Sequence, residues 1–285
     1  FKLLFKLLEI QSPLLETQTK SDLLTTDAYP IPNGKLRILL AEDNLVNQKV
    51  ALKQLKGLGY DADVAANGEE VLRLIEKIPY DLILMDCQMP VIDGFETTRE
   101  IHRRPEKCFP GGCRPLIVAM TANARKEDRK KCLNAGMDDY LSKPISKEKL
   151  AELLERFSRG ILLTGSGMLH QEAGANLPDL DWQYLHQISE NNQEFELELL
   201  QIFVEDTQVH LEGIKLAIAS NNFLQFERET HHIKGASANI GAASMRVTAE
   251  KLEKLARSQN LEETTDLISQ LEQIFHRIQA ELQNL

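Results

Sequence analysis

The chain has 285 residues, of which 42% are hydrophobic and 27% are charged, and its formal net charge is −10. A chain of this length can build two domains with separate cores, and its composition is ordinary for globular proteins. No apolar run is long enough to cross a membrane, so we expect no membrane contact by this segment.

The negative charge is concentrated in one part of the chain. Residues 179–285 hold 18 acidic against eight basic side chains, whereas residues 1–178 hold 25 of each. Nucleic acids attract basic surfaces, so an acidic C-terminal part argues against nucleic-acid binding.

The four cysteines indicate the compartment. Their spacing is irregular and forms no disulfide framework, which is typical of a reducing cytosol. We therefore expect a cytoplasmic segment. The chain begins with Phe1, so it is expected to be a piece of a longer protein. A membrane anchor elsewhere in that protein is compatible with this sequence.

The first half of the chain alternates between two patterns. Residues 1–34 contain three prolines and are predicted to be a lead-in or linker, with a short helix at its start. Within residues 35–157, five short apolar runs predict strands: LRILLA, ADVAA, DLILM, PLIVAM and YLS. Helical stretches are expected near 45–58, 69–78, 95–103, 126–135 and 147–157. Five β-α repeats predict an α/β fold with a doubly wound parallel sheet.

The second half shows only helical periodicity. Residues 158–178 are rich in glycine and are predicted to be a flexible linker. In residues 179–285 apolar side chains repeat every three or four positions, and the clearest stripe comprises Leu267, Leu271, Ile274, Ile278 and Leu282. This half is therefore predicted to be an all-α domain.

Reactive side chains stand at the ends of the predicted strands. Glu42 and Asp43 follow the first strand, and Asp86 ends the third. Thr121 ends the fourth strand, and Lys143 follows the fifth. In an open α/β sheet, ligands bind at the carboxyl ends of the strands, so we expect these side chains to converge.

The residue types favour phosphoryl chemistry. Crowded carboxylates require a cation, and an all-oxygen ligand set suits Mg²⁺. Asp86 would be the nucleophile that forms an acyl phosphate, Lys143 would neutralise the phosphoryl charge, and the Thr121 hydroxyl would donate to it. Pro144 after Lys143 is a candidate for a cis peptide bond. Taken singly, each acidic residue is more often a turn or a helix cap than a metal ligand.

The motifs AEDNLVNQ, LILMDCQMPVIDG, MTANA and YLSKP resemble those of a response-regulator receiver domain. The resemblance implies a flavodoxin-like strand order 2-1-3-4-5 and phosphorylation of Asp86. It implies a Mg²⁺ site made of Glu42, Asp43, Asp86 and the backbone carbonyl of Gln88. It further implies that Thr121 and Tyr140 are switch residues and that Lys143 contacts the phosphoryl group.

A second candidate phosphoacceptor lies in HHIKGASANIGA. His231, Lys234 and Gly235 are three and four positions apart, so they share one face of a predicted helix. A glycine inside a helix costs about 1 kcal/mol against alanine, and close approach of another protein would explain it. The alternative is an exposed histidine near a helix end that is capped by Gly235.

This string resembles the histidine phosphotransfer (HPt) domain. The resemblance implies a four-helix bundle in which the active histidine stands three positions before the lysine. That register selects His231 for phosphorylation, assigns Lys234 and Gly235 to the docking surface, and gives His232 the variable position.

Together the two motifs predict a component of a multistep phosphorelay. Asp86 would accept a phosphoryl group from a sensor histidine kinase, in the same full-length protein or in another one, and His231 would pass it to the receiver of a response regulator. No Gly-rich ATP-binding motif is found, so the chain is expected to be a phosphotransfer portion of a hybrid histidine kinase, without the kinase's catalytic domain.

Three other protein classes fit the sequence less well. An interaction module that has lost its chemistry would lack one of the acidic residues or Lys143, and none is missing. An aspartate-nucleophile phosphatase would carry an aspartate two positions after Asp86, where this chain has Gln88. A transcriptional regulator would need a basic DNA-binding output, whereas the C-terminal half is acidic.

Overall fold

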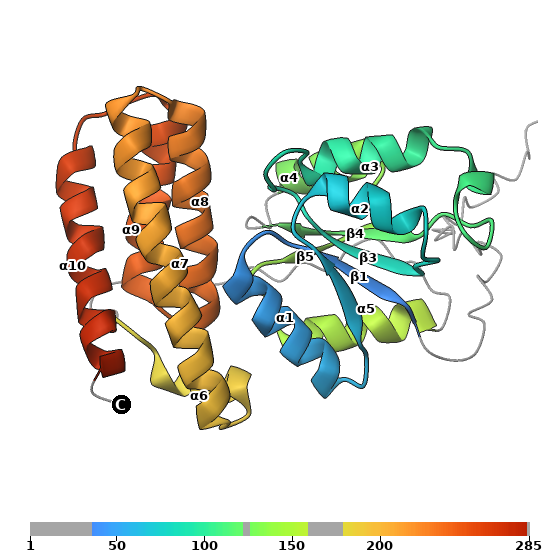
Figure 1. The fold of residues 1–285 in the computed structure, drawn as a ribbon, viewed down its shortest axis with the longest axis horizontal. Coiled ribbons are helices and arrows are strands. Elements are labelled where there is room, and N and C mark those ends of the chain that lie inside the picture. The colour runs from blue at the N-terminus through green and yellow to red at the C-terminus, as the bar shows by residue number, and fades with distance from the viewer. Residues whose placement is uncertain (1–35, 122–125, 159–178, 284–285) are drawn as a thin grey trace, which may run out of the picture.

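The computed structural model describes residues 36–121, 126–158 and 179–283. Figure 1 shows a helix-covered sheet beside a bundle of helices. Residues 1–34 and nearly all of 158–178 lie outside the described residues, so the lead-in and the linker stay predictions. In the described part of the chain, no helix is both long and apolar enough to span a membrane.

The sheet has the predicted strands and the predicted order. Its five parallel strands follow the order β2-β1-β3-β4-β5. They are β1 Ile38–Ala41, β2 Ala62–Ala65, β3 Leu82–Asp86, β4 Leu116–Thr121 and β5 Asp139–Ser142. Every residue of β3 is buried, as expected for a central parallel strand covered on both faces. The predicted doubly wound fold is thus confirmed.

Helices cover both faces of this sheet. They are α1 Leu45–Gly57, α2 Gly68–Ile75, α3 Gly94–Arg103, the 3₁₀ turn η1 Glu106–Cys108, α4 Lys126–Ala135 and α5 Lys147–Ser158. Helices α2, α3 and α4 lie on one face and α1 and α5 on the other (Figure 1). Alternate residues of β1 enter the two cores, Leu39 with one and Leu40 with the other.

Polar residues set the starts of three of these helices. The side chains of Asn44, Asn67 and Asp93 each accept a hydrogen bond from the backbone N–H three positions later. These bonds satisfy donors that the first helical turn leaves unpaired. The Asn44 cap ends the loop that carries Asp43, and the Asp93 cap ends the loop that follows Asp86. Both caps therefore help to position the candidate site.

The C-terminal part is a helical bundle, as predicted. Its helices are α6 Trp182–Ser189, α7 Gln193–Ala219, α8 Phe223–Ile240, α9 Ala243–Arg257 and α10 Thr264–Gln283. The last four run alongside one another (Figure 1). The predicted stripe of α10 faces the core, with Leu271, Ile274 and Ile278 buried and Leu267 and Leu282 packed at its edge.

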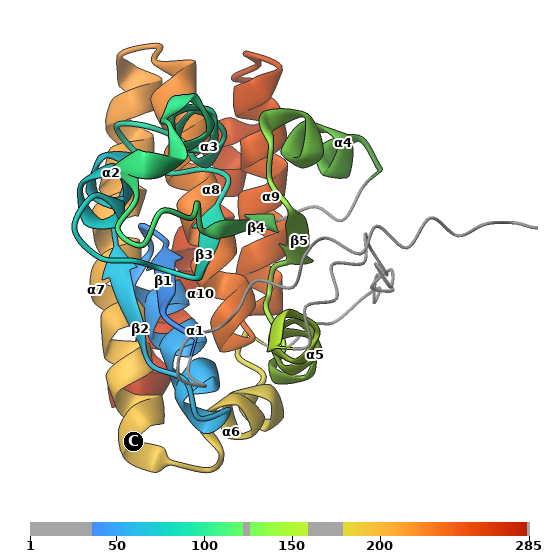
Figure 2. The ribbon, with the colours of Figure 1, turned by 90° about the vertical axis from the view of Figure 1, so that its right-hand side faces the viewer.

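Helix α1 joins the two parts. Figure 2 looks from the side of the sheet and shows the bundle behind it. Val46 and Val50 of α1 belong to the same apolar cluster as the core of the bundle. Lys49 Nζ lies 2.5 Å from Glu198 Oε1 of α7, at the rim of this contact. The contact combines an apolar centre with a charged edge, as protein interfaces commonly do.

Candidate functional site

The predicted strand-end residues converge at the carboxyl edge of the sheet. Carboxylate oxygens of Glu42, Asp43 and Asp86 all lie within 4.8 Å of one another. Lys143 Nζ lies 2.6 Å from Glu42 Oε2 and 2.7 Å from Asp86 Oδ2. Adjacent pairing of β1 with β3 brings these groups together from distant positions in the sequence. The Lys143–Pro144 peptide bond is cis.

Burial and charge oppose each other in this cluster. Glu42 is 1% exposed, and burial raises its pKa to about 7 against the attraction of Lys143. Burial alone would lower the pKa of Lys143, but Asp86 and Glu42 raise it well above its usual value. Burial would raise the pKa of Asp43, but its ion-pair contact with His232 leaves that pKa below the usual value.

The donor set fits a magnesium ion. All its side-chain donors are carboxylate oxygens, which hard cations such as Mg²⁺ prefer. Three carboxylates face a single ammonium group, so the cluster retains negative charge that a divalent cation would balance. Glu42 Oε1 accepts a hydrogen bond of 2.7 Å from Asn47 Nδ2, which fixes the orientation of this carboxylate.

The other predicted receiver residues lie on β4, on β5 and in the loop after β3. Thr121 is buried at the end of β4, and Tyr140 is partly buried on β5. The guanidinium carbon of Arg129 lies 5.6 Å from the centre of the Tyr140 ring. The backbone N–H of Gln88 donates to Asp86 Oδ1 at 3.2 Å. These positions are compatible with the predicted switch and metal roles, which stay predictions.

His231 lies on α8 against a buried ion pair. Its Nδ1 is 2.7 Å from Glu253 Oε1, and Lys234 Nζ is 2.6 Å from Glu253 Oε2. Arg257 Nη2 adds a third contact to Glu253 at 2.8 Å. Against its own burial, Glu253 has its pKa lowered to about 2 by His231 and Lys234. Lys234 is thus ion-paired and only 8% exposed. It lines the cleft beside Gly235, and its role on the docking surface stays a prediction.

Replacing Glu253 with glutamine is expected to destabilise the bundle in a pH-dependent way. The pKa of Glu253 is lower in the folded state, so its stabilisation is complete above the ordinary value of 4.5 and is lost as the pH falls toward 2. Glu253→Gln should therefore lower the free energy of unfolding by roughly 3 kcal/mol at neutral pH. Denaturant titrations at pH 7 and pH 3 measure this difference, which should shrink by about half at the lower pH.

Glu250→Gln is the matched control, because Glu250 lies on the same helix and forms its ion pair with an exposed lysine, Lys254. This variant should lose little stability. An equal loss for Glu253→Gln at both pH values would contradict the ionic role of Glu253.

His232 points into a different environment from its neighbour. Its Nε2 lies 2.8 Å from Asp206 Oδ2, and its Nδ1 lies 3.7 Å from Asp43 Oδ2. Its ring stacks on that of His210, with centroids 3.7 Å apart. Both ring nitrogens of His232 therefore face carboxylates, whereas His231 is held through Nδ1 alone among the contacts of the described residues.

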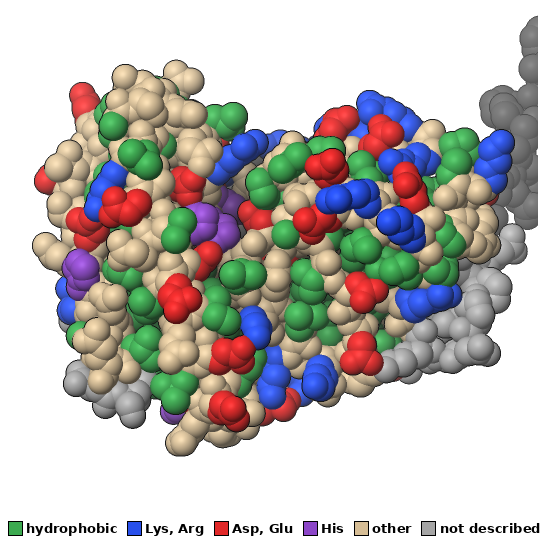
Figure 3. Space-filling view, in the orientation of Figure 1, with side chains coloured by type: hydrophobic (Ala, Val, Ile, Leu, Met, Phe, Trp, Pro, Cys, Tyr) green, Lys and Arg blue, Asp and Glu red, His purple; other side chains and the backbone are tan. Residues whose placement is uncertain are grey.

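One cleft contains both candidate phosphoacceptors. Its volume is about 740 Å³, and its lining includes Asp86 and Lys143 from the sheet and His231 and Gly235 from α8. Figure 3 shows the hollow between the two parts, with histidine side chains in it. The two candidate phosphoacceptors, Asp86 and His231, thus line the same cleft of one chain.

Gly235 lies in the contact between the two parts. A Cβ at this position would stand 3.3 Å from Asn47 Nδ2 of α1. Helix α8 continues past Gly235 to Ile240 and is capped by Gly241, which has φ +77°. The alternative in which Gly235 caps the helix is therefore wrong, and close approach of a second protein surface accounts for this glycine.

Polar residues for which the sequence had predicted no role join the two parts. Asn239 Nδ2 donates to Asn47 Oδ1 at 2.6 Å, and Asn44 Nδ2 donates to the backbone oxygen of His232 at 3.4 Å. Both Asn44 and Asn47 belong to the motif AEDNLVNQ. The signal in the sequence was a polar cap, Asn44, and a polar residue, Asn47, beside the apolar Val46 and Val50.

Comparison with known proteins gives two family matches. Residues 38–155 match the response regulator receiver domain, and residues 198–281 match the Hpt domain. Among solved structures, a receiver domain of a Pseudomonas aeruginosa sensor histidine kinase, with magnesium in its active-site cleft, is 45% identical. The match covers 44% of this chain and 98% of that receiver domain, and its TM-score is 0.39.

Two curated relatives are similar across both parts. The aerobic respiration control sensor protein ArcB of Escherichia coli is 30% identical over 86% of this chain, which spans 31% of that protein. The sensor histidine kinase GacS of Pseudomonas protegens is 29% identical over 86% of this chain, which spans 27% of that protein. The chain thus covers less than a third of either relative. Residues 38–155 belong to the response regulator receiver family, and residues 198–281 belong to the Hpt family.

Proposed function

We propose that this chain is the receiver–Hpt portion of a hybrid sensor histidine kinase and carries phosphoryl groups in a multistep phosphorelay. Asp86 would receive the group from a phosphohistidine of the kinase, and His231 would pass it to the receiver of a separate response regulator. The shared cleft carries this proposal, because it is lined by both acceptors. We also place the segment in the cytoplasm, where its four cysteines, which are free thiols, would stay reduced.

At the first station, an oxygen of Asp86 attacks phosphorus. The P–N bond of the donor phosphohistidine breaks as the new P–O bond forms, and the product is an acyl phosphate. The ammonium group of Lys143, which already contacts Asp86, stabilises the added negative charge. Glu42, Asp43, Asp86 and the carbonyl of Gln88 would hold Mg²⁺, which would supply further charge neutralisation at the phosphoryl oxygens.

At the second station, Nε2 of His231 is the attacking atom. Nδ1–H of His231 donates a hydrogen bond to the Glu253 carboxylate, so the lone pair of the neutral ring stands on Nε2. Attack by Nε2 forms a P–N bond, and the P–O bond to Asp86 breaks to leave its carboxylate. The ring then carries a positive charge, which the Glu253 carboxylate stabilises. Lys234 holds the second oxygen of Glu253 and so fixes its orientation.

Phosphoryl transfer from a labelled kinase tests the proposal directly. With Mg²⁺ and a phosphorylated histidine kinase as donor, the wild-type chain should acquire a base-labile label on aspartate and a base-stable, acid-labile label on histidine. Asp86→Asn should reduce both labels to background, because every phosphoryl group passes through Asp86. The measurement is the radioactivity retained after separate acid and base treatments.

Two outcomes of that experiment would contradict the relay. A wild-type chain that takes no label from competent kinases would be a docking module without chemistry. A base-stable label that persists in Asp86→Asn would show that His231 is charged without the receiver. Asp63→Asn is the matched control, because Asp63 lies on β2 and accepts a hydrogen bond from Tyr80, away from the cleft lining.

A further inference from the structure

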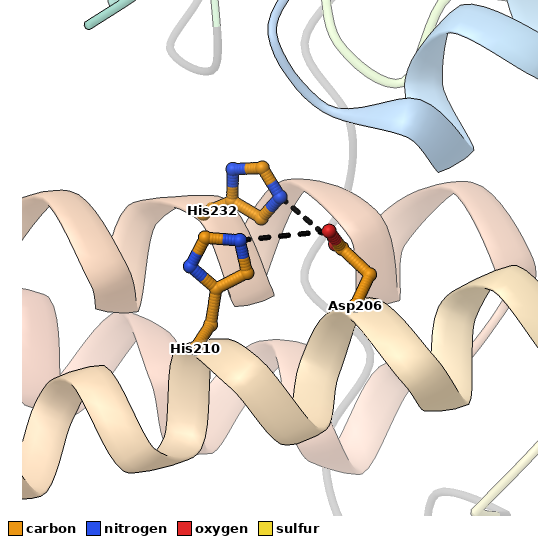
Figure 4. A group of neighbouring side chains, drawn as sticks. All are labelled: Asp206, His210 and His232. Atoms are coloured by element: carbon orange, nitrogen blue, oxygen red, sulfur yellow. Dashed lines mark hydrogen bonds and ion pairs between the residues drawn. The ribbon is translucent and has the colours of Figure 1, made fainter.

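Two histidines and an aspartate converge on the bundle side of the cleft. Asp206 and His210 lie one turn apart on α7, and His232 reaches them from α8 (Figure 4). The described residues contain two groups of potential metal ligands. One is the receiver cluster of Glu42, Asp43 and Asp86, and the other is this one. The phosphoryl transfer proposed above uses none of these three side chains.

The spacing of the ligand atoms suits a small tetrahedral ion. His232 Nε2 lies 2.8 Å from Asp206 Oδ2, and His210 Nε2 lies 3.5 Å from Asp206 Oδ1. Zinc binds nitrogen and oxygen ligands at about 2.0–2.2 Å, which places the ligand atoms of a tetrahedral site roughly 3.4 Å from one another. The two measured separations lie on either side of that value, so small side-chain movements would admit the ion.

Each imidazole is supported from behind by a carboxylate. His210 Nδ1 is hydrogen-bonded to Glu229 of α8, and His232 Nδ1 faces Asp43 of the receiver at 3.7 Å. A carboxylate that accepts a hydrogen bond from Nδ1–H leaves the Nε2 lone pair for a metal, which is the usual arrangement behind metal-bound histidines. Both Nε2 atoms turn toward Asp206 (Figure 4), so the cluster has ligands and orienting groups alike.

We propose that Asp206, His210 and His232 form a binding site for a divalent transition-metal ion, with Zn²⁺ as the reference ion. Imidazole ligands favour such ions over Mg²⁺, whereas the receiver site offers only oxygen. All three side chains line the cleft, so an ion can reach them. The site links α7 to α8 beside His231 and does not depend on the phosphorelay.

Metal titration of the intact chain tests this site. The chain is stripped with chelator, exposed cysteines Cys108 and Cys113 are replaced by serine to remove competing thiols, and excess Mg²⁺ fills the oxygen site. Zn²⁺ binding is measured by calorimetry, and Co²⁺ is added separately to read the visible absorption of a tetrahedral site. The variants are His210→Gln and Asp206→Asn. The control is His186→Gln, whose histidine pairs with the single carboxylate of Glu196.

One Zn²⁺ per chain should bind, with the affinity weakened about tenfold or more in His210→Gln and Asp206→Asn and unchanged in His186→Gln. Zn²⁺ should raise the unfolding temperature of the parent chain more than that of either ligand variant, because only the native state presents the site. Equal binding by the parent and both ligand variants would overturn the proposal, as would no measurable binding by a parent chain with a native circular dichroism spectrum.

Discussion

Substituting His231 with glutamine is expected to abolish the base-stable label of the chain and to leave the label on Asp86. Of the two adjacent histidines, only His231 keeps Nε2 available while Glu253 holds Nδ1. His232 faces Asp206 through Nε2 and Asp43 through Nδ1, so neither ring nitrogen is oriented to accept a phosphoryl group. His232→Gln should therefore still be phosphorylated on His231, at a reduced rate because its contact with the receiver is lost.

Acid and base treatment of each labelled variant measures the result, and mass spectrometry under basic conditions locates the modified residue. The two histidine variants control for each other, because they make the same substitution one position apart. A labelled His231→Gln and an unlabelled His232→Gln would show that the phosphoacceptor assignment on α8 is shifted by one residue.

Asp43→Asn is expected to reduce labelling of Asp86 to near background, and chelation of Mg²⁺ should have the same effect on the wild type. Asparagine keeps the size of the side chain but removes the charge of one of three clustered carboxylates. The remaining groups would bind a hard cation more weakly, so the phosphoryl group would lack charge neutralisation during transfer. The measurement is the initial rate of base-labile label formation, with Mg²⁺ added back to the chelated sample.

Asp43 also contacts His232, so its loss disturbs the contact between the two parts as well as the metal site. His232→Gln removes the same contact but keeps the carboxylate, and it should label Asp86 at the wild-type rate. Full labelling of the wild type in excess chelator would refute the metal requirement, and equal losses in both variants would assign the effect to docking.

The sequence predicted the sheet well because its signals are local. Each strand is a short apolar run followed by a cap or turn residue, as at β1 with Asn44 and at β3 with Asp93. Because the carboxyl ends of parallel strands meet at one edge of the sheet, the convergence of Glu42, Asp86 and Lys143 could be predicted before the tertiary structure was known. The α10 stripe was likewise visible, because a buried helix face repeats every three or four residues.

The surroundings of His231 could not be predicted in the same way. Glu253 lies 22 positions away on α9 and reaches His231 only because α8 and α9 pack against each other. In the sequence it resembles any surface glutamate between two lysines. The Asn47–Asn239 bond joins residues 192 positions apart and depends on how the two parts dock, which no local pattern encodes.

The contact of α1 with α7 and α8 has a consequence for the order of events in the proposed relay. The receiver occupies the face of α8 that carries Gly235, and a downstream receiver would need that same face to reach His231. The chain's own receiver is covalently linked to the bundle, so dilution does not separate the two. Only molecules whose own receiver is undocked can bind the downstream receiver. The apparent dissociation constant of that partner is therefore the intrinsic value divided by the undocked fraction. Conditions that loosen α1 from the bundle would then raise output without altering either phosphoacceptor.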